Sequence, residues 1–432
     1  MSERDWGFRT RALHAGGTPD PETGARAVPI YQTTSFVFDD AADAANLFAL
    51  QKYGNIYSRI GNPTVAAFEE RMASLEGGIG GVATGSGQAA EFLTFAALAE
   101  AGEHIVSASG LYGGTVTQLD GTLRRFGIDT TFVPETDRDS ADGFAAAITG
   151  KTRLLFTEVI GNPSGNIADI AALADVAHAH DIPLVVDATL ATPYLCRPIE
   201  HGADIVLHSA TKFLGGHGTT LGGVVVESGR FDWGNGKFPR MTEPVASYGG
   251  LRYWENFGEF AFCTRLRAEQ LRDIGAVLSP HSAFLLLQGV ETLPQRMDAH
   301  VANAKAVADY LAADPRVTWV GYAGLADHRH ADRARRYLPL GPGAVFSFGI
   351  KGGRAAGERF VESVELLSHL ANVGDARTLV IHPASTTHQQ LSEEQLLQAG
   401  VGPDLIRLSV GLEDLDDILW DIDQALAKAV AA

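Results

Sequence analysis

A repeated cycle of apolar runs and helical stretches between residues 80 and 227 constrains the fold of this chain most strongly. Several of the runs are apolar throughout instead of alternating, as is typical of strands that are buried on both faces. The runs span residues 81–84, 104–108, 130–133, 153–159, 183–187, 204–208 and 223–227, with helical stretches at 88–101, 113–127, 140–149 and 168–180. This alternation predicts an α/β fold with a mostly parallel, seven-stranded sheet covered by helices.

The two ends of the chain lack this cycle. Residues 1–60 contain turn-rich and extended segments, which we interpret as an N-terminal arm that contacts a neighbouring subunit. A loop rich in glycine, proline and aromatic residues follows the cycle, and then helical sequence continues to about residue 311. Further strands are expected near 317–320, 344–350 and 405–410. We therefore predict a large domain over residues 61–279 and a smaller α+β C-terminal domain over 280–432.

The charge of the chain and its pattern of apolar residues limit which partners it can bind and where in the cell it is expected. The chain has 34 basic and 52 acidic side chains, a net charge of −18 that disfavours nucleic acids and anionic membrane surfaces. The one basic run, 329–336, is interrupted by Asp332 and predicts a solvated helix face. No apolar stretch is long enough for a transmembrane helix, and the charged start of the chain does not resemble a secretion signal. Two cysteines cannot form a disulfide framework, so we expect a cytoplasmic protein.

The 48 glycines cluster between apolar runs, which indicates backbone that turns tightly or approaches a ligand. Residues 85–90 (GSGQAA) follow a predicted strand and open a helix, so they fit the dinucleotide fingerprint G-x-G-x-x-G/A. A dinucleotide site also needs an acidic residue about 20 positions later to bind the ribose, and the segment Ser107–Tyr112 contains none. The pattern favours a phosphate loop, and a nicotinamide-linked oxidoreductase becomes a distant alternative.

A lysine and an aspartate follow two of the buried strands. Ser209, Thr211 and Lys212 follow the predicted strand at 204–208. Residues 209–212 match the S-x-x-K motif of serine acylases, but those enzymes also need S-D-N and K-T-G elements, which this chain lacks. A desolvated lysine at the carboxyl end of a strand can form a Schiff base. The hydroxyls of Ser209 and Thr211 could then bind a phosphate group. Asp187 closes another strand and needs a cation, such as a protonated ring nitrogen. Together these residues supply what pyridoxal phosphate requires.

At this point the chain resembles a known family over nearly its whole length: the pyridoxal-phosphate enzymes of cysteine and methionine metabolism, which include the cystathionine synthases and lyases. Within the family it is most similar to the O-acetylhomoserine sulfhydrylases, by residues 191–202, the insertion at 231–248 and residues 373–375. The shared motifs are YSRxGNPT at 57–64, the 85–88 loop, YGGT at 112–115, Asn162-Pro163, the Asp187 strand, SATK at 209–212 with the following GGHG, and RLSVGLE at 407–413.

The resemblance implies roles for individual residues. Lys212 would carry the cofactor and move protons, and Tyr112 would stack on the pyridine ring with its phenol near the leaving group. Tyr57 and Arg59 would bind the phosphate of a neighbouring subunit's cofactor. Arg407 would bind the substrate carboxylate, and Asn372 also belongs to the substrate pocket. The cofactor-binding residues implied are Tyr57, Arg59, Gly87, Gln88, Tyr112, Asn162, Asp187, Ser209, Thr211 and Lys212.

The resemblance also implies the fold and the reaction. The fold would be PLP-dependent transferase fold type I, like that of aspartate aminotransferase, in a homotetramer of active dimers. The reaction would be γ-replacement of acetate by sulfide or methanethiol on O-acetylhomoserine, in methionine biosynthesis. A γ-lyase and an O-succinylhomoserine sulfhydrylase remain alternatives; methionine γ-lyases typically have a cysteine where this chain has Gly114. No metal site is expected, because the H-x-H pairs at 178–180 and 328–330 lack a third ligand and predict solvated or helix-surface histidines.

Overall fold

The computed structural model describes residues 5–134, 140–386, 389 and 401–430. Among these residues, seven strands form the larger sheet in the order β1-β7-β6-β5-β4-β2-β3, in which β7 alone runs antiparallel to its neighbours. The strands are β1 (Gly80–Thr84), β2 (His104–Ala108), β3 (Asp129–Val133), β4 (Thr152–Glu158), β5 (Leu184–Asp187), β6 (Ile205–Ser209) and β7 (Gly223–Glu227). The predicted mostly parallel, seven-stranded sheet is confirmed.

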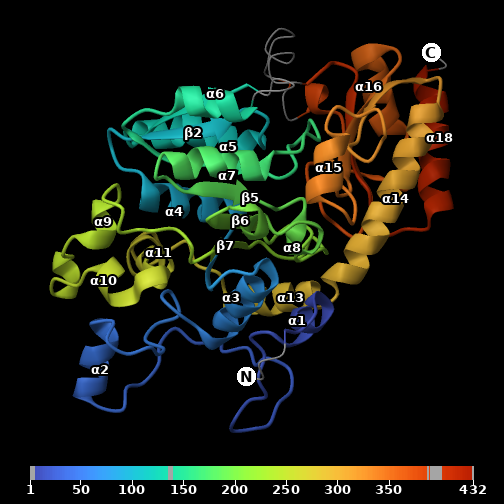
Figure 1. Ribbon diagram of the computed structural model, residues 1–432. Helices are drawn as coiled ribbons and strands as arrows, with labels where there is room; N and C mark the ends of the chain where they lie inside the picture. The colour runs from blue at the N-terminus through green and yellow to red at the C-terminus, as the bar shows by residue number, and fades with distance from the viewer. Residues whose placement is uncertain (1–4, 135–139, 387–388, 390–400, 431–432) are drawn as a thin grey trace.

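Helices surround this sheet (Figure 1). The predicted helix at 113–127 is present as α5 followed by a π-helical turn at Gln118–Leu123, and α4 packs on β6 and β7. The helices of this region are α3 (Pro63–Glu76), α4 (Gly87–Leu98), α5 (Gly113–Thr117), α6 (Ser140–Ala147), α7 (Ile170–Ala179), α8 (Thr192–Leu195), α9 (Pro239–Thr242), α10 (Tyr253–Phe257), α11 (Ala261–Arg265), α12 (Arg272–Ile274) and α13 (Pro280–Glu291).

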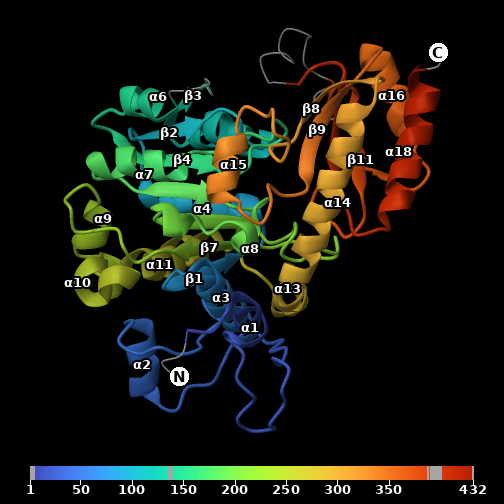
Figure 2. The same cartoon turned by 45° about the vertical axis from the view of Figure 1, so that its right-hand side comes forward.

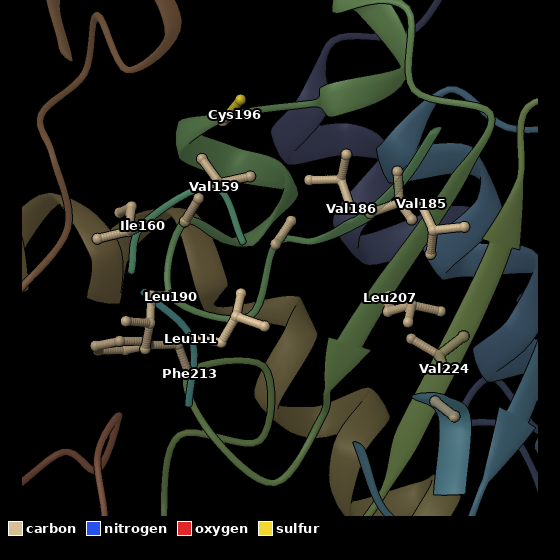
Figure 3. Packing of buried hydrophobic residues seen from close by; sticks show 14 of the residues in the cluster. Leu111, Val159, Ile160, Val185, Val186, Leu190, Cys196, Leu207, Phe213 and Val224 are labelled. Atoms are coloured by element: carbon tan, nitrogen blue, oxygen red, sulfur yellow. The ribbon is translucent and has the colours of Figure 1, made fainter. Parts of the chain in front are cut away.

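The central strands of the larger sheet form the centre of the hydrophobic core. Val185 and Val186 of β5, Leu207 of β6 and Val224 of β7 are fully buried, and Figure 3 shows these side chains packed between the sheet and its helices. Each such valine or leucine contributes about 1.5–3 kcal/mol by leaving water. This burial explains why these strands are continuous apolar runs in the sequence. It also fixes the positions of the polar residues at the carboxyl ends of β5 and β6.

A second sheet occupies the described part of the C-terminal region. Five strands lie in the order β10-β11-β12-β9-β8: β8 (Val317–Gly321), β9 (Val345–Ile350), β10 (Ser368–His369), β11 (Leu379–Ile381) and β12 (Leu405–Ser409). The helices here are α14 (Leu293–Ala313), α15 (Ala331–Tyr337), α16 (Gly353–Ser363) and α18 (Leu415–Val430). Figure 2 shows α14 running from the first sheet region to the second, where α16 and α18 pack together.

The N-terminal region lies apart from both sheets. It contains α1 (Phe8–His14), which packs on α3 and α13, and α2 (Ala41–Phe48), which extends away from the rest of the chain in Figures 1 and 2. Several large apolar side chains of this region are exposed, with Val37 at 99% and Tyr53 at 83%. In the described part of the chain, no helix combines the length and apolar character that crossing a membrane requires.

The basic run at 329–336 is not simply a solvated helix face, so that expectation is wrong in part. Arg333 donates to the carbonyl of Ile167 at 3.1 Å, and buried His330 accepts the Ile167 N–H at 2.9 Å. Arg329 also donates to the side chain of Asn166. The run therefore binds the segment that follows β4, because this segment exposes backbone groups that need partners.

Candidate active site

A cavity lined by polar residues lies at the carboxyl ends of the parallel strands, where ligands bind in open α/β sheets. It encloses about 210 Å³. Ten of the predicted site residues line it: Gly87, Gln88, Tyr112, Asn162, Asp187, Ser209, Thr211, Lys212, Asn372 and Arg407. The structure thus brings together residues that are up to 320 positions apart, from Gly87 to Arg407.

The start of helix α4 forms one wall of the cavity. Ser86 caps the helix by accepting the Ala89 N–H at 3.1 Å, so the first amides of α4 point toward the cavity. Gly87 touches β6 closely, since a Cβ there would lie 2.6 Å from the Cβ of Ser209. A helix N-terminus beside the hydroxyls of Ser209 and Thr211 is a suitable anion site.

The carboxylate of Asp187 forms the floor of the cavity. The Thr189 N–H donates to Asp187 Oδ1 at 2.8 Å, and the Thr189 hydroxyl accepts the Ser209 N–H at 2.8 Å. Burial raises the pKa of Asp187, whereas the hydrogen bonds from Thr189 and the nearby His208 oppose this rise. Thr189 was not among the predicted site residues, although an aspartate side chain commonly accepts the backbone N–H two residues later.

Lys212 presents its amine to the same cavity from the turn after β6. Its Nζ donates to Oδ1 of Asn372 at 2.5 Å. Burial, helped by the positive charge of Arg407, lowers the pKa of Lys212 to about 8. A substantial fraction of this amine is therefore neutral near pH 8, which a nucleophilic lysine requires.

Arg407 reaches the cavity from β12 of the second sheet, so both sheets contribute to the site. Its Nη1 donates to Oδ1 of Asn162 at 3.3 Å and its Nη2 to the carbonyl of Asn372 at 3.2 Å. Burial lowers the pKa of Arg407 to about 10, and the guanidinium still stays charged at neutral pH. A buried guanidinium of this kind suits a carboxylate ligand.

Tyr112 stands at the mouth of the cavity, half exposed, directly before α5. Its N–H donates to Oε1 of Glu158 at 2.7 Å. The ring lies over Gly114, since a Cβ at this glycine would be 2.5 Å from a ring carbon. Gln88 of α4 contacts α5, because its Nε2 donates to the carbonyl of Gly114 at 3.1 Å. The glycine after Tyr112-Gly113 thus permits this orientation of the tyrosine.

Tyr57 and Arg59 do not line the cavity of their own chain. The Arg59 guanidinium lies 5.6 Å from the centre of the Tyr57 ring and donates to the carbonyl of Arg272. Tyr57 is 41% exposed.

Two acidic residues that were not among the predicted site residues, Glu91 and Glu158, line the cavity. Neither stands in a short motif, so only the fold shows that they face it.

The cavity fits pyridoxal phosphate by the chemistry of its donors. Lys212 offers an amine of lowered pKa, and Asp187 offers a buried carboxylate for a cationic ring nitrogen. The contact between Gly87 and Ser209 closes an anion cradle that a Cβ would fill. These are the amine, the acid and the phosphate donors that this cofactor needs.

Comparison with known proteins agrees with this geometry. A family model described as "Cys/Met metabolism PLP-dependent enzyme" matches residues 9–427. The chain is 54% identical over 425 residues to "Sulfhydrylase FUB7" of Fusarium oxysporum, covering 98% of each protein. It is 50% identical over 432 residues to the "O-acetyl-L-homoserine sulfhydrylase" of Leptospira meyeri, covering 98% of this chain and 97% of the relative.

A solved structure is also similar over almost the whole chain. The crystal structure of a putative O-acetylhomoserine (thiol)-lyase from Campylobacter jejuni, with N′-pyridoxyl-lysine-5′-monophosphate, has a TM-score of 0.93 at 38% identity. The match covers 98% of this chain and 100% of the other. The predicted PLP-dependent fold type I is thereby confirmed. The chain belongs to the pyridoxal-phosphate-dependent enzymes of cysteine and methionine metabolism, and its cofactor is pyridoxal phosphate.

Proposed function

We propose that the protein is an O-acetylhomoserine aminocarboxypropyltransferase, or sulfhydrylase, that makes L-homocysteine and acetate from O-acetyl-L-homoserine and sulfide. With methanethiol, the same reaction makes L-methionine. The observation that carries the proposal is that Lys212, Asp187 and Arg407 line one cavity. The choice of substrate is supported by the relatives from Leptospira meyeri and Thermus thermophilus, both named as O-acetyl-L-homoserine sulfhydrylases. The reaction belongs to methionine biosynthesis.

The two anionic groups are assigned to two different sets of residues that line the cavity. Arg407 binds the α-carboxylate of the amino acid, with Asn162 and Asn372 holding the guanidinium in place. The amides of Gly87 and Gln88 and the hydroxyls of Ser209 and Thr211 bind the cofactor's phosphate. The −18 net charge of the chain does not favour either anion, so local donors must provide the affinity.

Asp187, Lys212 and Tyr112, which we assign to the reaction itself, line the same cavity. Bound pyridoxal phosphate supplies an electron sink for the electron pair that remains when Cα of the substrate loses its proton. Asp187 stabilises a proton on the ring nitrogen. The neutral Lys212 Nζ takes the proton from Cα and must give it up before it can take one from Cβ. It returns protons after acetate has left Cγ and sulfide has bound there. Tyr112 lies at the cavity mouth, where its phenol can contact the leaving group.

The N-terminal arm, residues 1–60, completes the site of a neighbouring subunit in this proposal. Tyr57 and Arg59 lie away from the cavity of their own chain, and exposed apolar side chains such as Val37 and Tyr53 need cover. We assign residues 61–279 to the large domain, 280–432 to the C-terminal domain, and a homotetramer of active dimers to the assembly. A cytoplasmic location suits the two buried free thiols, Cys196 and Cys263.

Product analysis tests the reaction. Purified holoenzyme supplied with O-acetylhomoserine and sulfide should release homocysteine and acetate in equal amounts. Release of 2-oxobutyrate as the main product would establish a γ-lyase instead, and faster turnover of O-succinylhomoserine would change the ester. Lys212→Ala, which lacks the amine, should lose both the visible absorption of the bound cofactor and the activity.

Complementation tests the arm. Arg59→Ala and Lys212→Ala should each be inactive alone, the first through the phosphate contact and the second through chemistry. Unfolding and refolding the two variants together forms mixed oligomers. If Arg59 acts across the subunit interface, some sites then have both residues and activity returns. If activity stays absent after mixing, each site uses the arm of its own chain.

A further inference from the structure

A second carboxyl group lies beside Asp187 in the cofactor cavity and has no role in the reaction described above. Glu91 stands on α4, one turn after Gln88, and lines the cavity while being 4% exposed. Its Oε1 accepts the hydroxyl of Thr115 at 2.8 Å. Its Oε2 is buried and has no hydrogen-bond partner among the residues that the structure describes. A buried carboxyl oxygen without a partner is costly unless it carries a proton or meets a ligand.

The surroundings of the two acids differ in a way that separates their charges. Thr189 supports the carboxylate of Asp187 with hydrogen bonds, and His208 lies near it. Glu91 receives one hydroxyl hydrogen bond, and burial together with the negative charge of Asp187 raises its pKa well above the usual value. Two carboxylates that face one cavity cannot both ionise cheaply, so the better-supported acid keeps the charge and the other keeps the proton.

We propose that Glu91 is a positioning residue of the cofactor site: it is a neutral carboxylic acid whose Oε2–H points into the cavity beside Asp187 and keeps the negative charge on Asp187. The charge on Asp187 is what a protonated ring nitrogen needs. Thr115 orients the acid, because its hydroxyl occupies Oε1 and leaves Oε2 to donate. The inference depends on the cofactor cavity and not on which amino acid or sulfur compound reacts.

Infrared spectroscopy tests the protonation state directly. The difference spectrum of wild-type holoenzyme minus Glu91→Gln at neutral pH should contain the C=O stretch of a protonated carboxylic acid. Asp187→Asn serves as a comparison, because it should remove a carboxylate band. A difference spectrum in which Glu91→Gln removes only carboxylate bands would overturn the proposal.

Cofactor affinity tests the positioning role. Glutamine is neutral and can still donate through its amide, so Glu91→Gln should bind pyridoxal phosphate within about twofold of the wild type. Glu91→Leu removes the donor and should weaken binding by about tenfold or more. Equal weakening in both variants, or none in Glu91→Leu, would contradict a neutral donor.

The control for these substitutions is Thr94→Val on the same helix. Thr94 is fully buried, its hydroxyl also has no partner among the described residues, and it does not line the cavity. Thr94→Val should therefore leave the cofactor's affinity and visible spectrum unchanged. Circular dichroism of Glu91→Leu and Thr94→Val separates loss of the cofactor contact from loss of the helix.

Discussion

The amine of Lys212 lies 2.5 Å from the side-chain oxygen of Asn372, a contact between two residues 160 positions apart. The backbone carbonyl of the same Asn372 accepts a hydrogen bond from Arg407 at 3.2 Å. One asparagine therefore links the lysine that we assign to the cofactor to the arginine that we assign to the substrate's carboxylate. Its neutral side chain accepts from the lysine without adding a charge, so the amine can lose its proton near neutral pH.

The first prediction concerns the uncharged side chain of Asn372 beside the Lys212 amine. In wild-type apoenzyme, the rate of cofactor incorporation should rise as the pH increases through about 8, because the neutral amine of Lys212 is the nucleophile. Asn372→Asp places a carboxylate beside the amine, raises the pKa of Lys212, and should slow incorporation at pH 7.5 by about tenfold or more. Stopped-flow absorbance measures the profile. An unshifted profile in Asn372→Asp, with Asn372→Ser as the uncharged control, would contradict this account.

The second prediction concerns Arg407. Arg407→Lys keeps a positive charge but loses the planar fork and the two hydrogen bonds to Asn162 and Asn372. Breaking a buried charged contact costs about 2–5 kcal/mol, so kcat/KM for O-acetylhomoserine should fall by about 30-fold or more. The loss should be mainly in KM, while the cofactor's affinity stays unchanged. Steady-state kinetics and a cofactor titration distinguish the two quantities, and an equal loss of cofactor affinity would argue against a substrate role.

The third prediction concerns the phosphate cradle. In Gly87→Ala the new methyl group meets Ser209 at a distance that no packed structure tolerates, so α4 and β6 must move apart. Such overpacking costs about 1–3 kcal/mol, and cofactor affinity should fall by about fivefold or more. Gly121→Ala is the matched control, because a methyl group there meets nothing within 4 Å. Equilibrium dialysis against pyridoxal phosphate gives both affinities; similar values for the two variants would mean that Gly87 is not part of the cradle.

The fourth prediction concerns the contact between α15 and the segment after β4. His330→Ala removes the acceptor of the Ile167 N–H and leaves that buried donor unsatisfied, which costs about 1–3 kcal/mol of unfolding free energy. Urea denaturation followed by fluorescence measures this loss. His281→Ala, at an exposed position, is the control and should change stability little. If the two variants are equally stable, the hydrogen bond of His330 does not stabilise the folded chain.

The strands and the main site residues could be predicted from sequence because their signals are local. A strand buried on both faces must be apolar along its length, and β5 and β6 are such strands. Polar residues at the ends of these strands, Asp187 and Lys212, stand out against that background. The basic run at 329–336 had no comparable signal, because charged residues on a helix read the same whether they face water or another segment.

The sequence by itself determined the mostly parallel sheet, the placement of Asp187 and Lys212 after buried strands, and the glycine loop at 85–90, because the hydrophobic effect and glycine sterics act over short stretches. Only the tertiary structure decided that Arg407 and Asn372 meet Lys212, that Thr189 supports Asp187, and that Glu91 faces the same cavity. These relationships depend on how the two sheets and α4 pack. Burial then sets the pKa values of the buried groups, and burial is a property of the assembled fold.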